Sequence, residues 1–188
     1  MQTDLDLLIH RAAESQSAAE ELFALLYDEL HRLAEHTLRR DGGAFSLGTT
    51  TLLHETYLKV AGREGLAFDD RTRFFAYAAR AMRTLVIDYA RQRRAIKRGA
   101  QFEVTLDDEI AGQSPAIDAG ETLVRIGDAL AELTAVDPSL AELVDLHFFG
   151  GFTLGEIGAF RDVSERTVQR DWRKARLLLR NALPDDVR

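Results

Sequence analysis

The segment TLGEIGAFRDVSERTVQRDWRKARLLLR, residues 153–180, contains the clearest local structural signals in the chain. Thr153 and Ser164 are each placed to cap a helix, and RDV between them is short enough for a tight turn. Small residues in the first helix, such as Gly158, allow the two helices to approach closely. Apolar residues recur at helical spacing on one side of the second helix: Val168, Trp172, Ala175 and Leu179. The segment predicts a helix-turn-helix, with a plain helical hairpin as the alternative.

A helix-turn-helix places the N-terminal half of its second helix in the major groove of DNA. Arg and Gln side chains read base edges there, and neighbouring cations hold phosphates. The cap and the polar residues on the outer faces of the second helix are therefore candidate DNA contacts: Ser164, Glu165, Arg166, Thr167, Gln169, Arg170, Arg173 and Lys174.

The remaining sequence also predicts helices, and strand signals are almost absent. We expect an all-α fold of two small helical domains, residues 1–98 and 121–188, joined by a flexible Gly-containing linker at residues 99–120 with a short ordered piece at 102–106. In the first domain, the predicted helices are residues 17–40, which begin with a Ser17–Glu20 capping box, a shorter helix that follows the threonines at 49–51 and stops at Gly62, and a third that runs from an Asp70 or Thr72 cap to Arg98. In the second domain, one helix is predicted at residues 121–135 and the next from an Asp137 cap to Phe149.

Charge is distributed in blocks along a chain whose formal net charge is −7. Residues 71–98 carry nine cations and a single acid, Asp88, whereas residues 103–145 are acidic and residues 161–180 are basic again. Two basic segments separated by an acidic one are typical of a protein that contacts a polyanion at two places. Two solvated helix faces would give the same pattern.

Several functional classes are disfavoured by the sequence. The chain has no cysteine, which excludes disulfides and thiolate metal sites. His31 and His36, and the pair His54 and Glu55, have no third ligand at motif spacing. No phosphate-binding glycine loop and no catalytic set of nucleophile and base is evident, so we expect neither an enzyme nor a cofactor. The N-terminal residues do not resemble a signal peptide and no run is long enough to span a bilayer, so we expect a cytoplasmic protein that binds no membrane.

Three segments resemble a known family. LVDLHFFGGFTLGEIGAFRDVSERTVQRDWRKARLLLR resembles region 4 of bacterial sigma-70-type factors, LLHETYLKV resembles region 2.2, and RFFAYAARAMRTLVIDYARQRRAIKR resembles regions 2.3 and 2.4. Their order, the short chain and the missing domain between them are similar to extracytoplasmic-function (ECF) sigma factors. The resemblance extends from about Ser17 to Leu183.

The resemblance implies a bacterial sigma factor that directs core RNA polymerase to specific promoters and has no catalysis of its own. Domain two would bind the β′ clamp helices through Leu52, Leu53, Glu55, Thr56 and Lys59. It would hold the −10 element through Arg80, Arg83, Thr84, Asp88 and Arg91. Domain four would bind the β flap and read the −35 element with its second helix. The loop GREGLAFDDR would capture a flipped −10 base, or serve as an ordinary connection, and the acidic TLDDE would mimic nucleic acid.

Three consecutive threonines, Thr49, Thr50 and Thr51, stand where most ECF factors carry an acidic run before region 2.2. A phosphate would restore the missing negative charge at a helix N-terminus. A resembling subset of the family is thought to be activated by a Ser/Thr kinase. We therefore hypothesise activation by phosphorylation of Thr51, with Thr50 and Thr49 as fallback sites; simple helix capping is the alternative.

A stand-alone helix-turn-helix regulator is the second functional reading of the sequence. It accounts for residues 153–180 but gives no role to LLHETYLKV or to the basic segment at residues 71–98. Dependence of DNA binding on core polymerase distinguishes the two readings.

Overall fold

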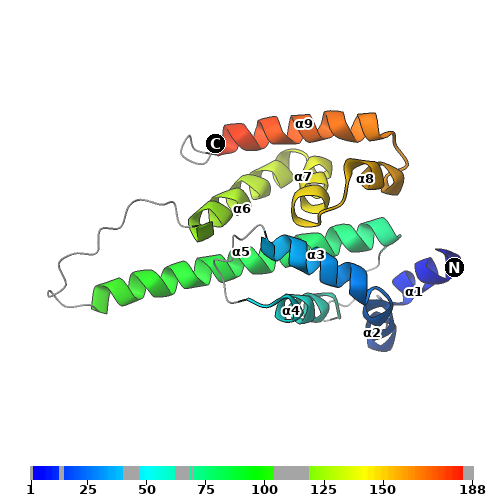
Figure 1. The fold of residues 1–188 in the computed structure, drawn as a ribbon, viewed down its shortest axis with the longest axis horizontal. Coiled ribbons are helices and arrows are strands. Elements are labelled where there is room, and N and C mark those ends of the chain that lie inside the picture. Colours follow the sequence, from blue (N-terminus) through cyan, green and yellow to red (C-terminus); the bar gives the residue numbers. More distant parts are fainter. Residues whose placement is uncertain are drawn as a thin grey trace.

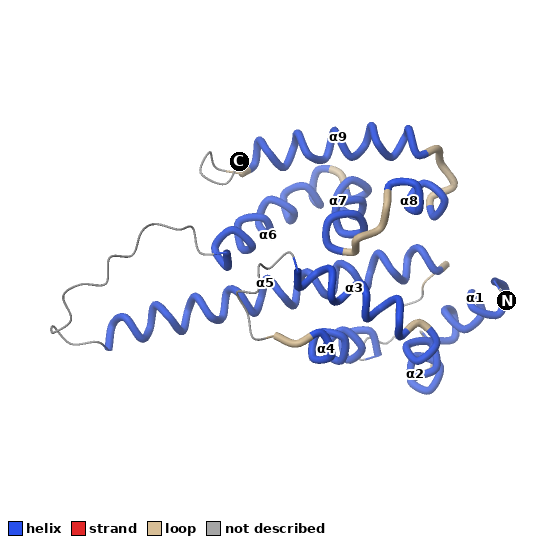
Figure 2. The backbone as a smooth tube through the Cα atoms, viewed as in Figure 1, coloured by secondary structure: helices blue, strands red, loops and turns tan. Residues whose placement is uncertain are grey.

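The computed structural model describes residues 2–12, 15–39, 47–61, 68, 70–103 and 119–183, and contains no strand within these ranges (Figures 1 and 2). The prediction of an all-α fold is confirmed. The helices are α1 (Gln2–Ala12), α2 (Gln16–Leu25), α3 (Tyr27–Arg39), α4 (Thr49–Ala61), α5 (Arg71–Glu103), α6 (Ala119–Val136), α7 (Pro138–Val144), the π-helical turn η1 (Asp145–Phe149), α8 (Leu154–Phe160) and α9 (Glu165–Ala182).

Helix α5 is the long central element of the N-terminal half of the molecule, which we define as α1–α5. Asp70 caps it, since the Asp70 carboxylate accepts the Arg73 backbone N–H at 2.8 Å. At 1.5 Å per residue the helix is about 50 Å long. It continues to Glu103, so the prediction of a helix end at Arg98 and a linker from residue 99 is wrong for its first residues. Residues 104–118 of the predicted linker lie outside the described residues, and residues 119 and 120 belong to α6.

Helices α2 and α3 form the segment that was predicted as one helix. The chain bends at Leu26, whose φ and ψ are −100° and 16°. Hydrogen bonding continues through the bend, because Leu26 N–H donates to Leu22 O and Leu30 N–H to Leu26 O. The predicted capping box is wrong, since α2 begins at Gln16 after Ser15. Helix α1, which the sequence analysis did not predict, buries Leu8 and Ile9 in the core.

Helices α6–α9 form the C-terminal half of the molecule. Asp137 caps α7 as predicted, accepting the Leu140 N–H at 3.2 Å, and Pro138 occupies the first turn. The predicted regular helix to Phe149 instead ends in the π turn η1, where the Gly150 N–H donates to Asp145 O at 2.8 Å. Helices α8 and α9 lie where residues 153–180 predicted them.

One hydrophobic core is shared by both halves. In Figure 1 the layer formed by α6–α9 lies along α5 and α3, with α4 on the opposite side. Phe74, Phe75 and Met82 of α5 belong to the same buried cluster as Leu130, Leu143, Leu146 and Phe149 of the C-terminal half. The halves are therefore not separate in this structure. Helical periodicity in the sequence identifies apolar faces but does not say which helix each face meets.

Candidate nucleic-acid interface

Helices α8 and α9 are each begun by a capping residue that the sequence predicted. Thr153 Oγ1 accepts the Glu156 N–H at 3.1 Å, and the Glu156 carboxylate accepts the Thr153 N–H at 2.8 Å, completing a capping box. The Thr153 N–H and the Thr153 hydroxyl both donate to the Glu156 carboxylate, and these two hydrogen bonds hold the pKa of Glu156 below its ordinary value. Ser164 Oγ accepts the Thr167 N–H at 3.2 Å and begins α9. Both caps are confirmed.

The turn between α8 and α9 depends on a close approach of backbone. Asp162 adopts a left-handed φ of 51°, a conformation that Asp tolerates better than most residues. A Cβ on Gly158 would lie 2.9 Å from the carbonyl oxygen of Val163. Only glycine fits there without displacing the turn, which fixes how α9 packs against α8.

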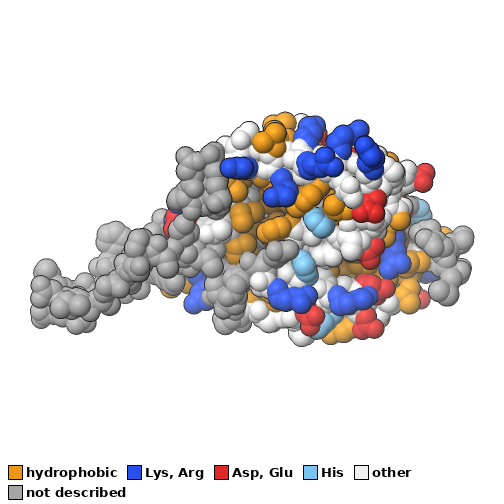
Figure 3. All heavy atoms as spheres, turned by 45° about the horizontal axis from the view of Figure 1, so that its top comes forward, with side chains coloured by type: hydrophobic (Ala, Val, Ile, Leu, Met, Phe, Trp, Pro, Cys, Tyr) orange, Lys and Arg blue, Asp and Glu red, His pale blue; other side chains and the backbone are white. Residues whose placement is uncertain are grey.

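Of the eight residues predicted to contact DNA near the start of α9, all but the half-buried Thr167 and Gln169 are exposed, and Figure 3 shows basic side chains gathered over α9 beside an apolar strip. Most of them also make local contacts: Ser164 with Thr167 at 2.9 Å, Gln169 with Glu165 at 3.0 Å, Arg170 Nε with Asp171 Oδ1 at 3.5 Å, and Lys174 Nζ with Asp137 Oδ2 at 3.0 Å. The hydrogen bond from Lys174 lowers the pKa of Asp137.

The arginine face of α5 is a stripe formed by Arg73, Arg80, Arg83, Arg91 and Arg94. Their spacing of seven, three, eight and three residues places them on one side of an α-helix. Arg80 is exposed and Thr84 is half-buried, with the Thr84 hydroxyl bonded to Arg80 O at 2.8 Å. Arg91 lies 3.4 Å from Asp88 and 2.6 Å from Asp128 of α6. Of the predicted −10 contacts, Arg80 and Arg91 are exposed and Thr84 and Asp88 are half-buried.

Arg83 is buried in this structure and is not accessible to DNA in this conformation. Its Nε lies 2.6 Å from Asp145 Oδ1 of η1, and its Nη2 donates to Oδ2 at 3.3 Å. The Nε–H of Arg83 does not point along the 2.6 Å contact, so Arg83 Nε and Asp145 Oδ1 form no hydrogen bond despite their short distance. The guanidinium also lies 5.9 Å from the Phe149 ring centroid. Burial raises the pKa of Asp145 to about 6, although Arg83 acts in the opposite direction.

Helix α4 begins at Thr49, with the Leu52 N–H donating to Gly48 O, so Gly48 and not a threonine precedes the helix. Thr49 is half-buried, whereas Thr50 and Thr51 are exposed in the first turn. The predicted polymerase contacts Leu52, Leu53 and Thr56 are buried in the core, and Thr56 Oγ1 bonds to Leu52 O. We correct that prediction: these three side chains hold α4 in place, while Glu55 and Lys59 reach the surface.

Sequence reasoning missed the acidic face that opposes α5. Glu121 and Asp128 of α6, Glu142 of α7 and Asp145 of η1 each form an ion pair with an arginine of α5. The seven-residue spacing of Glu121 and Asp128 was a usable signal, because it places both on one side of a helix. The loop at residues 62–71 lies largely outside the described residues, and TLDDE lies entirely outside them.

Comparison with known proteins places the chain in a family. A model of the ECF sigma factor family matches residues 4–185, which include α4, the arginine face of α5 and the α8–α9 pair. No significant match was found among curated proteins or among solved structures. None of the helices in the described ranges is both long and apolar enough to span a membrane. The chain therefore belongs to the ECF sigma factor family, whose members bind core RNA polymerase and promoter DNA to initiate transcription.

Proposed function

We propose that this sigma factor reads the −35 promoter element with α9 and holds the −10 element with α5. The observation that carries the proposal is that the family match spans two separate basic helices. Arg166 and Arg170 project from the capped first turns of α9, the part of such a helix that enters a major groove. Asp88, Arg83 and Arg91 of α5 serve the −10 strand once the ion pairs of α5 are released, and Arg80 and Thr84 serve it directly.

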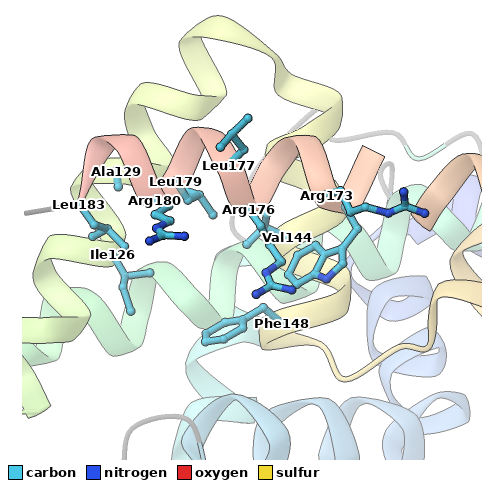
Figure 4. Close-up of a pocket in the computed structure, with 11 residues that line it drawn as sticks. Ile126, Ala129, Val144, Phe148, Arg173, Arg176, Leu177, Leu179, Arg180 and Leu183 are labelled. Atoms are coloured by element: carbon cyan, nitrogen blue, oxygen red, sulfur yellow. The ribbon is translucent and has the colours of Figure 1, made fainter. Parts of the chain in front are cut away.

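Core polymerase binding is assigned to two surfaces. The exposed edge of α4, with Glu55 and Lys59, is proposed to meet the β′ clamp helices. An apolar groove of about 500 Å³ between α6, η1 and α9 is proposed to receive the β flap (Figure 4). Ile126, Phe148 and Trp172 line this groove, and Arg173, Arg176 and Arg180 border it. An apolar floor with a cationic rim suits an amphipathic helix that carries acidic residues.

Transcription with core polymerase tests this assignment. Substituting Arg170→Ala is expected to weaken promoter use by about five- to 150-fold, the effect of about 1–3 kcal/mol lost at a base contact. The control Arg32→Ala removes the same charge from an exposed position on α3, outside the surfaces proposed to bind DNA or polymerase. Equal binding of promoter DNA with and without core polymerase would instead favour a stand-alone helix-turn-helix regulator.

Phosphorylation of Thr51 is proposed to complete the polymerase-binding surface. The first turn of α4 contains no acidic residue, and Thr51 is exposed at its third position. A phosphate there lies close to backbone N–H groups that have no partner within the helix, and the helix dipole favours its charge. Its three acceptor oxygens also suit bidentate pairing with arginines of a basic clamp. Thr50 shares the exposure of Thr51, and Thr49 is less accessible.

The switch is tested with phosphothreonine incorporated at position 51 during translation. Capture of core polymerase is expected to strengthen at least tenfold over the unmodified chain and to fall back after phosphatase treatment. Thr51→Glu is expected to recover less, because a carboxylate supplies one charge and fewer acceptors. If the unmodified chain and Thr51→Ala bind core polymerase as tightly as the phosphorylated chain, Thr51 is not a switch.

A further inference from the structure

The apolar groove between α6, η1 and α9 has the composition of a small-molecule site. Its volume is about 500 Å³, which is within the range of cavities that hold single ligands. Ile126, Phe148 and Trp172 line the groove and are only half-buried, so large apolar side chains face water in the free chain. A ligand that covers them removes apolar surface from water, which favours its binding.

The groove is elongated along α9. Trp172, Arg176, Leu179 and Leu183 line it and follow one another at steps of four, three and four residues, so they lie on one side of the helix. Trp172 and Leu183 are about 16 Å apart along the helix axis at 1.5 Å per residue. An apolar surface of this length suits an extended chain better than a compact ring.

The rim of the groove is cationic. Arg173, Arg176 and Arg180 border it, and no acidic side chain is among the described residues that line it. In Figure 4 the side chains of Arg176 and Arg180 extend from α9 toward Ile126 and Phe148. Arg176 is exposed and forms no ion pair within the described part of the chain. An anion above the apolar floor therefore meets positive charge and displaces no carboxylate from Arg176.

We propose that the apolar groove binds one molecule of a fatty acid, or of another unbranched acyl chain that ends in a carboxylate. The acyl chain lies on Ile126, Phe148 and Trp172. The carboxylate pairs with Arg176 and Arg180, because a guanidinium forms strong charge-assisted hydrogen bonds with such a group. The occupant is a single molecule rather than a bilayer surface, since a concave groove encloses a chain.

Bound fatty acid is expected to oppose polymerase binding, and this consequence alone rests on the proposed function, which places the β flap in the same groove. The acyl chain and the flap cannot both cover Phe148 and Trp172. Each therefore weakens the binding of the other by the same factor. A rise in free fatty acid then lowers the fraction of the sigma factor that is bound to core polymerase.

Trp172 makes binding measurable without a label, because it is the only tryptophan in the chain and lines the groove. The intact protein is titrated with saturated fatty acids from octanoate to palmitate, below their micelle concentrations, while Trp172 fluorescence is followed. Affinity is expected to rise about three- to fourfold for each added methylene until the groove is filled, the effect of about 0.8 kcal/mol. A brominated chain should quench Trp172 by contact. An affinity that does not depend on chain length would overturn the proposal.

Matched variants separate the groove from the remaining surface. Ile126→Glu places a carboxylate in the groove and is expected to weaken laurate binding at least about tenfold through like-charge repulsion. Val136→Glu makes the same change at a position on the same helix that is 75% exposed, and should leave binding unchanged. Arg176→Gln is expected to weaken binding about two- to fivefold, as for an exposed ion pair, with the exposed Arg166→Gln as its control.

Circular dichroism checks that each variant is folded. Because Arg176 is on the surface, its variant keeps the test decisive even if Ile126→Glu does not fold. Equal laurate binding by Arg176→Gln and Arg166→Gln, or by Ile126→Glu and Val136→Glu, would overturn the site.

Other occupants of the groove give different results. A dimer in sedimentation of the wild type that is lost in Ile126→Glu would assign the groove to a second copy of the chain. Binding to phosphatidylglycerol vesicles without binding of free laurate would assign it to a membrane. Either result overturns the proposal.

Capture of core polymerase with and without laurate separates the inference from the proposed function. Laurate is expected to reduce capture of the wild type. If laurate binds the groove but capture is unchanged, the fatty-acid site stands and the assignment of the β flap to this groove fails. If laurate does not bind while Ile126→Glu still weakens capture, the flap assignment stands and the fatty-acid site fails.

Discussion

The free energy of unfolding is predicted to depend on Asp145 far more than on Asp128, although both carboxylates lie 2.6 Å from an arginine nitrogen. The side chains of Arg83 and Asp145 are 8% and 4% exposed, whereas those of Arg91 and Asp128 are 48% and 62% exposed. Asp145→Ala leaves a guanidinium buried without its counter-charge, which costs about 3–5 kcal/mol. Asp128→Ala breaks a solvated pair, which costs about 1 kcal/mol or less.

Urea unfolding followed by circular dichroism and by Trp172 fluorescence measures both values. A single transition is expected for the wild type because its two halves share one core. The double variant Arg83→Met and Asp145→Leu removes both charges and is expected to regain most of the stability that Asp145→Ala loses. Losses within about 0.5 kcal/mol of each other for Asp145→Ala and Asp128→Ala would refute the argument from burial.

Other changes have smaller expected effects on stability or binding. Burial raises the pKa of Asp145 to about 6, against the opposing effect of Arg83 and Arg80, so the folded state binds a proton more tightly than the unfolded state, in which the pKa is 3.8. Stability from this group therefore rises as the pH falls, by about 1.4 kcal/mol between pH 7.5 and pH 5, and Asp145→Asn should abolish that increment in paired urea titrations. Gly151→Ala is expected to cost about 1–2 kcal/mol, because Gly151 has a φ of +75° and the new Cβ would lie 2.7 Å from His36 Nδ1; a change below 0.5 kcal/mol in thermal unfolding would contradict this. Ser164→Ala is expected to lose about 1 kcal/mol through the α9 cap, measured by urea unfolding, with Ser164→Thr retaining most of it.

Local features of this fold were predictable because their causes lie within a few residues. The caps at Asp70, Asp137, Thr153 and Ser164 each depend on a side chain and a backbone N–H three positions away. The outer position of Arg166 and Arg170 follows from helical periodicity alone.

Features that depend on distant partners were not predictable in the same way. Arg83 looked like a surface cation among many, but its partner Asp145 is 62 positions away in the sequence. Leu52 and Leu53 resembled contact residues by family position, yet the packing of α4 on α3 and α5 buries them. The sequence shows blocks of opposite charge, and only the fold shows that they neutralise each other.

The π turn η1 makes the orientation of the acidic face depend on the number of residues in one turn. Each residue rotates an α-helix by about 100°, so shortening η1 by one residue would turn Glu142 and Asp145 away from α5 relative to α8 and α9. Loss of a single codon in this turn is therefore expected to break both ion pairs while leaving the sequences of α5 and α9 unchanged.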